Sequence, residues 1–137
     1  MSGTIASPSS LMTNEIVDNT TGLITPARIR DMVESYAAMP HTAQTASYTA
    51  VFADRGTLIE MNVATANTFT VPPHSSVAFP TDATLTVSQM GAGQVTITAG
   101  AGVTIRTPSS LTTRAQYSTV SVRQRAQDEW VLSGDMT

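Results

Sequence analysis

The residues best suited to chemistry are few in this chain, and they are widely spaced. The chain has two histidines and no cysteine. His41 and His74 each follow a proline, and neither has further ligand residues at the spacing that a zinc site uses. The lack of cysteine removes thiolate metal sites, disulfides and a cysteine nucleophile. We therefore expect both histidines in surface loops, and we expect no metal and no cofactor.

Carboxylates, serines and glycines offer no catalytic pattern either. No Gly-x-Ser-x-Gly nucleophile turn occurs, and Gly91-Ala92-Gly93 precedes a predicted strand rather than the helix that a phosphate-binding turn needs. The carboxylates after residue 46 are scattered, and three of the aspartates sit in turn clusters where they have a local role. These residues are Asp54, Glu60, Asp82, Asp128, Glu129 and Asp135. Nothing selects an acid–base pair, so we predict no catalytic residue and no enzyme.

The charge balance excludes one large class of partner. All seven basic residues are arginine, the net charge is −3, and charged residues make up 12% of the 137 residues, against roughly 25% in an average globular protein. A nucleic-acid-binding protein needs a basic surface, so we expect none here. A surface with so little charge resists self-association poorly, which favours a homo-oligomer.

The N-terminal segment has no feature of a signal peptide, because residues 1–17 lack a basic start and an apolar run. We expect it to be an extended arm. No stretch is long and apolar enough to cross a membrane.

A single helix is predicted over residues 26–38. Thr25 stands at the N-cap position, Pro26 at the first helical position, and Pro40 ends the pattern. One apolar stripe follows the helical spacing and is formed by Ile29, Met32, Val33 and Tyr36. So short a helix is marginal alone, so we predict that this stripe docks on a partner surface.

From residue 47 onward the chain alternates between short strand patterns and turns. The composition, rich in threonine and valine, also favours strands. Nine strands are predicted, at 47–53, 57–62, 68–71, 76–79, 84–90, 94–99, 103–107, 117–124 and 129–134. The expected fold class is mainly β, a small antiparallel β-sandwich or barrel-like domain over 46–137. Before it, residues 1–45 comprise the arm, the helix and a linker at 41–46. The echo Val-Thr-Ile in QVTITAGAGVTI predicts a tight hairpin or two rungs of a β-roll.

The apolar positions of these strands predict a thin core, which again favours an oligomer that buries more surface. The predicted core residues are Val51, Leu58, Ile59, Phe69, Val71, Val77, Phe79, Leu85, Val87, Val95, Ile97, Val103, Ile105, Val120, Val122, Trp130 and Leu132.

Several segments, in order along the chain, resemble a β module of tailed-bacteriophage structural proteins. The module has D-x-G-x-x-[IV]-E-M-N, T-V-P, G-A-G-x-V-T-I, R-A-Q-Y and W-x-L-x-G-D. These pieces correspond to Asp54–Asn62, Thr70–Pro72, Gly91–Ile97, Arg114–Tyr117 and Trp130–Asp135. Asp18–Asp31 also resembles a segment, D-N-[TS]-T-G-x-I-[TS]-P-x-x-[LI]-R-D, that opens phage tail and fibre proteins.

The resemblance implies a virion component, made in the bacterial cytoplasm, of the fibre, spike or decoration type. It implies a homotrimer whose N-terminal segment attaches to capsid or tail proteins and whose β domain projects. The alternative is a module that binds carbohydrate or a receptor on the host surface, for which Tyr48, Tyr117 and Trp130 are the candidates. We expect all three aromatics in the core or an interface, because the chain has so few aromatic residues.

Overall fold

The computed structural model describes residues 25–35 and 39–137. The chain divides into two compact units, Met1–Met39 and Pro40–Thr137. The division lies six residues before the predicted boundary between 45 and 46. The predicted arm at 1–17, the end of the helix and Tyr36 fall outside the described residues.

The N-terminal unit contains α2 (Pro26–Ser35). The backbone N–H of Arg28 donates to the Thr25 hydroxyl at 3.3 Å, and that of Ile29 donates to the Thr25 carbonyl at 3.1 Å. The predicted N-cap and the proline at the first helical position are therefore confirmed. Of the predicted docking stripe, Ile29 is half-buried. The side chains of Met32 and Val33 lie outside the described part, so docking of this stripe stays a prediction.

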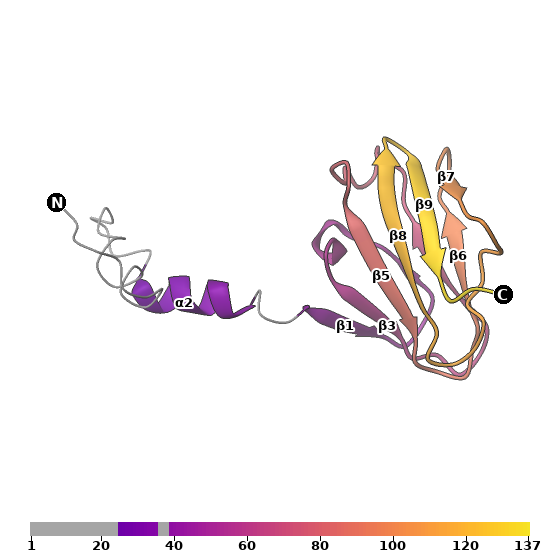
Figure 1. Cartoon of the computed structure of the whole chain (residues 1–137), viewed down its shortest axis with the longest axis horizontal. Helices are drawn as coiled ribbons and strands as arrows, with labels where there is room; N and C mark the ends of the chain where they lie inside the picture. Colours follow the sequence, from indigo (N-terminus) through magenta and orange to yellow (C-terminus); the bar gives the residue numbers. More distant parts are fainter. Residues whose placement is uncertain (1–24, 36–38) are drawn as a thin grey trace. The chain divides into compact units, whose positions relative to one another are not determined.

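The C-terminal unit is built from nine strands and one short 3-10 helix, most of which are labelled in Figure 1. Their bounds are β1 (His41–Gln44), β2 (Tyr48–Thr49), η1 (Phe52–Asp54), β3 (Leu58–Met61), β4 (Asn67–Val71), β5 (Thr84–Gln89), β6 (Val95–Ala99), β7 (Thr104–Arg106), β8 (Thr119–Ala126) and β9 (Glu129–Gly134). They form a six-stranded sheet, β1-β3-β5-β8-β9-β7, and a three-stranded sheet, β2-β4-β6. The mainly β fold class is confirmed.

The expected antiparallel pairing is wrong for five of the seven strand pairs, which are parallel. The chain moves from one sheet to the other after each of the first six strands, so β1, β3 and β5 stack in one sheet and β2, β4 and β6 in the other. The tight hairpin predicted for the Val-Thr-Ile echo is also wrong, because β6 and β7 belong to different sheets. This alternation between two sheets agrees with the alternative prediction, in which the echo forms two rungs of a β-roll.

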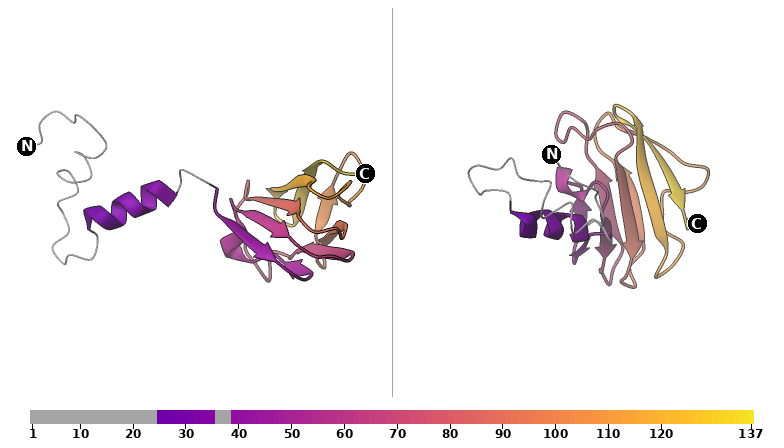
Figure 2. Two further views of the ribbon diagram at one scale, coloured as in Figure 1. Left: turned by 90° about the horizontal axis from the view of Figure 1, so that it is seen from below. Right: turned by 60° about the vertical axis from the view of Figure 1, so that its left-hand side comes forward.

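Among the named strands, antiparallel pairing involves β8, which lies between β5 and β9. Two isolated antiparallel bridges, Thr96 with Thr112 and Thr113 with Met136, lie outside these pairs. The β8–β9 turn contains Asp128 at φ 56°, a left-handed conformation that aspartate tolerates. In Figure 2 the strands of the larger sheet follow one another from the purple β1 edge to the yellow β9.

One hydrophobic core draws on both sheets. Its buried residues are Ala50, Ile59, Met61, Phe69, Val71, Phe79, Ala83, Leu85, Val87, Val95, Ile97, Val120, Val122, Trp130 and Leu132. The prediction for Val51 is wrong, since this side chain is 46% exposed at the start of η1, where the strand pattern breaks off. The prediction missed Met61, which faces inward two residues after Ile59 on β3.

Two segments differ from their predicted structure. Residues 41–44 of the predicted linker form β1, paired in parallel with β3. Residues 76–79, predicted as a strand, form turns and irregular chain, although Phe79 still enters the core. There the backbone N–H of Val77 donates to the carbonyl of Pro73, two residues after β4 ends at Val71, and not to a neighbouring strand.

Candidate functional site

The two histidines lie on different segments of the C-terminal unit. His41 lies on β1 and His74 in the loop after β4. Within residues 25–35 and 39–137, no three His, Cys, Asp or Glu side chains are placed to hold a metal ion. The local hydrogen-bonding role predicted for the turn aspartates holds for Asp54, which accepts from the Val51 N–H. Asp82 instead accepts from Arg123, and Asp128 accepts from the backbone N–H of His74 at 2.7 Å.

Asp54 is the most buried carboxylate in the described part, with 3% exposure, and its role is structural. One oxygen accepts hydrogen bonds from the Tyr48 hydroxyl at 2.9 Å and from the Val51 N–H at 2.8 Å. Burial of the ring, followed by the hydrogen bond to Asp54, raises the pKa of Tyr48 to about 12. This pair fixes the turn that leads into β3.

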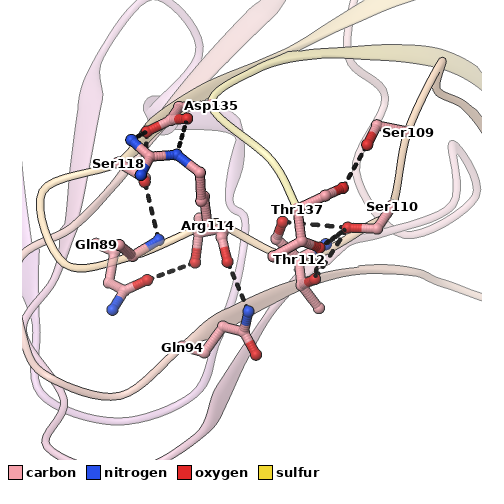
Figure 3. A network of polar contacts seen from close by, with 11 residues as sticks. Gln89, Gln94, Ser109, Ser110, Thr112, Arg114, Ser118, Asp135 and Thr137 are labelled. Atoms are coloured by element: carbon pink, nitrogen blue, oxygen red, sulfur yellow. Dashed lines mark hydrogen bonds and ion pairs between the residues drawn. The ribbon is translucent and has the colours of Figure 1, made fainter.

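A denser polar network joins the segment before β8 to the end of β9, as Figure 3 shows. Arg114 donates two hydrogen bonds to Asp135, at 2.7 and 2.8 Å, and the Ser118 hydroxyl donates a third at 2.7 Å. The Arg114 hydrogen bond, with help from Ser118, holds the pKa of Asp135 below its usual value. The same contact raises the pKa of Arg114. The two charges therefore neutralise one another in a fork-shaped pair.

A buried glutamine on β5 also holds this network in place. Gln89, 2% exposed, accepts a hydrogen bond from the Thr113 hydroxyl at 2.5 Å and donates to the Gly91 carbonyl at 3.2 Å. Its backbone exchanges hydrogen bonds with the loop, since its N–H donates to Ser118 at 2.9 Å and its carbonyl accepts from Tyr117 at 2.7 Å. The loop Arg114–Ser118 is thus held at the ion pair and at the backbone of β5.

Tyr117 is the residue that this loop presents to solvent. Its side chain is 70% exposed, and its backbone φ is 72°. A bulky residue at positive φ is strained by roughly 1–2 kcal/mol, because its Cβ crowds the carbonyl oxygen. The neighbouring Gln116 donates from its amide to the Met90 carbonyl at 2.9 Å, which fixes the loop on its other side.

A cluster of hydroxyl groups lies beside this network in Figure 3, where the last residue meets the segment after β7. The Thr112 and Thr137 hydroxyls are 2.8 Å apart, and Ser110 contacts both of them. Ser109 donates to the Thr137 carbonyl. These contacts tie down the chain end and leave its side chains half-buried or exposed.

The chain enters the C-terminal unit at one end of the larger sheet, and the Arg114–Ser118 loop lies at the other. Pro40 accepts a hydrogen bond from Leu58 at the start of β3, which pairs with the first half of β5. Tyr117 bonds to Gln89, the last residue of β5. Leu58 pairs with Thr86, so three residue steps of β5, about 10 Å, separate the two points along the strand.

Of the three aromatic candidates, only Tyr117 is exposed. Trp130 is 2% exposed, and Tyr48 packs against the core. A core or interface position was predicted for Tyr117 because the chain has few aromatic residues. Its exposure rules out the core, and an interface position stays a prediction. Tyr117 also lies before β8, which begins at Thr119 and not at the predicted residue 117. Its positive φ is set by tertiary hydrogen bonds, so no local sequence pattern marks it.

Comparison with family models, curated proteins and solved structures finds no match. No helix in the described residues has the length and apolar character needed to cross a membrane.

Proposed function

We propose that this chain is a non-enzymatic structural component of a tailed-bacteriophage particle. In this proposal the first 39 residues attach it to head or tail proteins, and the β unit projects from the virion. The sequence resemblance described above supports this proposal. The capped helix agrees with it, because a short helix before a separately folded unit suits an attachment segment.

The observation that carries the proposal is the polarity of the β unit. The chain enters beside Leu58, and the Arg114–Ser118 loop, which exposes Tyr117, lies at the far end of β5. An attachment segment at one end leaves the other end free to face outward. The ion pair in this loop also joins Arg114 and Asp135, which belong to two of the module's sequence motifs.

Self-association of the β unit, as a homotrimer, is part of the same proposal. β1 is an edge strand that pairs only with β3, is exposed over three of its four residues, and carries no Lys, Arg, Asp or Glu. The opposite edge, β7, has three residues and carries Arg106, which is paired with Glu129 at 3.1 Å. Proteins protect edge strands with charge and shortness, so β1 is the edge that suits another copy. A closed ring would cover it in every copy.

The test is a chain truncated to residues 40–137, expressed in infected cells that lack the intact protein. The cut is placed at Pro40 because β1 belongs to the sheet. We expect a folded β unit that is missing from purified particles. A chain lacking only residues 1–17 is the matched control, and it separates the arm from the helix. Incorporation of the 40–137 chain at the intact level would rule out N-terminal attachment.

A further inference from the structure

We propose that the Arg114–Ser118 loop binds a sugar ring of an uncharged glycan, with the exposed ring of Tyr117 as its stacking surface. The site is argued from this unit alone. Its role on a particle, facing away from the attachment end, rests on the proposed function.

The backbone conformation of Tyr117 supports a binding role for this residue. A tyrosine at φ 72° is strained where glycine or asparagine would not be, and strain of this kind clusters at binding sites. The unit retains it although the side chain adds nothing to the core, since the ring is 70% exposed. The benefit of tyrosine at this position must therefore lie in what its ring contacts outside the chain.

The loop is also rigid enough to act as a preformed site. Its first residue, Arg114, is bonded to Asp135 at two points, and its last residue, Ser118, is 3% exposed and bonded to the same carboxylate. The Ala115 N–H donates to the Ser118 hydroxyl at 3.1 Å, which closes the loop on itself. A ligand that meets a fixed ring loses less entropy to ordering of the protein.

The surroundings favour a sugar over a protein surface. Protein interfaces are centred on clustered apolar and aromatic residues. Two adjacent exposed hydrophobic residues, Val51 and the aromatic Phe52, lie beside the start of β3, at the opposite end of the unit. The residue next to Tyr117 is the exposed amide Gln116. The loop itself therefore presents one aromatic ring beside a polar amide, which matches the one apolar face and the hydroxyls of a pyranose.

The charge of the loop points to an uncharged ligand. Its single cation, Arg114, is matched by Asp135 at 2.7 Å, so no unpaired positive group remains in the loop to bind a carboxylate or phosphate. We therefore assign hexose or N-acetylhexosamine units rather than acidic sugars.

The test uses the full chain on an array of uncharged hexose and N-acetylhexosamine oligosaccharides, followed by calorimetric titration of the strongest binder. Tyr117→Ala should weaken binding by about tenfold, as expected for loss of one aromatic stacking surface. Tyr117→Phe keeps the ring and should bind within about twofold of the wild type. Phe52→Ala removes an exposed ring at the other end and should leave binding unchanged. Tyr117→Gly should lose binding yet melt no lower than the wild type, since it relieves the strain.

Three results would overturn the assignment. They are the absence of any uncharged glycan that binds the wild type, equal binding by Tyr117→Ala, and loss of Tyr117→Ala from purified particles. The last would show that the loop contacts a protein of the particle. The first two leave the attachment proposal untouched, because that proposal is tested by the 40–137 chain. The third would also contradict the outward orientation of this loop in the proposed function.

Discussion

Arg114 and Asp135, 21 residues apart in the chain, meet in a two-point ion pair with N–O distances of 2.7 and 2.8 Å. The pair joins the segment before β8 to the residue after β9. Because Ser118 donates to the same carboxylate, Asp135 holds both ends of the loop that carries Tyr117. Asp135 therefore positions the exposed ring without touching it.

The first prediction concerns this carboxylate. Asp135→Asn replaces an acceptor of three hydrogen bonds with an uncharged amide, and the loop should open more often. We expect the backbone amides of residues 115–118 to exchange with deuterium about tenfold faster, while those of β5 and β8 keep their protection. The control is Asp82→Asn, because Asp82 also pairs with an arginine, Arg123 at 2.6 Å, and its φ of 68° suits asparagine. Unchanged exchange in Asp135→Asn would show that the ion pair does not hold the loop.

Much of the fold follows from the sequence because local chemistry agrees with the tertiary structure. β9 begins and ends where the pattern predicts, and Thr25 caps the helix that Pro26 begins. Strand direction does not follow, because alternation of apolar residues is the same in parallel and antiparallel sheets. The direction here is set by which sheet the chain enters after each turn, and that depends on contacts between residues far apart in sequence. Strands β4 and β6 show this, since the paired residues Val71 and Ala99 are 28 residues apart in the chain.

Only part of the candidate site could be predicted from the sequence. Tyr117 was among the candidates because exposed aromatics suit carbohydrate, but the sequence predicted a strand position for it. Its exposure results from Gln89 and Asp135, which hold the loop from two other segments. Contacts at such separations leave no periodic trace in the sequence.

The second prediction tests the close packing of successive turns. A Cβ on Gly93 would overlap the carbonyl oxygen of Thr65, a backbone atom of the preceding turn that cannot move aside. Gly93→Ala should therefore lower the free energy of unfolding by about 3 kcal/mol or more, as overpacking does. Gly56→Ala is the control, because Gly56 has φ 71° and open space around it, so only the backbone strain of about 1 kcal/mol applies. Chemical denaturation of both variants measures the difference, and equal losses would contradict the packing argument.

The third prediction concerns alkaline stability. The pKa of Tyr48 is raised from 10.0 to about 12 in the folded chain, so folding favours the protonated phenol. That contribution is complete below the unfolded pKa of 10.0 and is lost as the pH rises through about 12. Tyr48→Phe lacks the ionisable group and should lose this step. It should also be less stable at neutral pH by about 1 kcal/mol, through the missing hydrogen bond to Asp54.

Unfolding free energies measured in denaturant at several pH values test this directly. Tyr117→Phe, which removes an exposed hydroxyl, is the control. It should lose stability with rising pH as the wild type does, because Tyr48 is intact. If Tyr48→Phe still loses stability over the same pH range, the loss must come from the ionisation of another group.

The last prediction concerns the free edge of β1. The carbonyls of Pro40 and Gln44 accept hydrogen bonds from Leu58 and Asn62, at 2.9 and 2.8 Å. Backbone groups of a parallel strand alternate between its two neighbours, so the N–H of Thr42 faces β3 and that of Ala43 faces the open edge. Ala43→Pro removes a donor that the β unit does not use internally, and prolines are tolerated at such edge positions.

If copies associate through this edge, Ala43→Pro should shift the mass in solution from that of an oligomer, three chains by our expectation, to that of one chain. Light scattering measures the mass, and circular dichroism should show an unchanged β spectrum. Thr42→Pro is the matched control, since it removes a donor to β3 and should destabilise the unit itself. A monomeric wild type would contradict self-association altogether. An oligomer that persists in Ala43→Pro would instead place the contact on a face of the sheets, because the donor at the edge is then not needed.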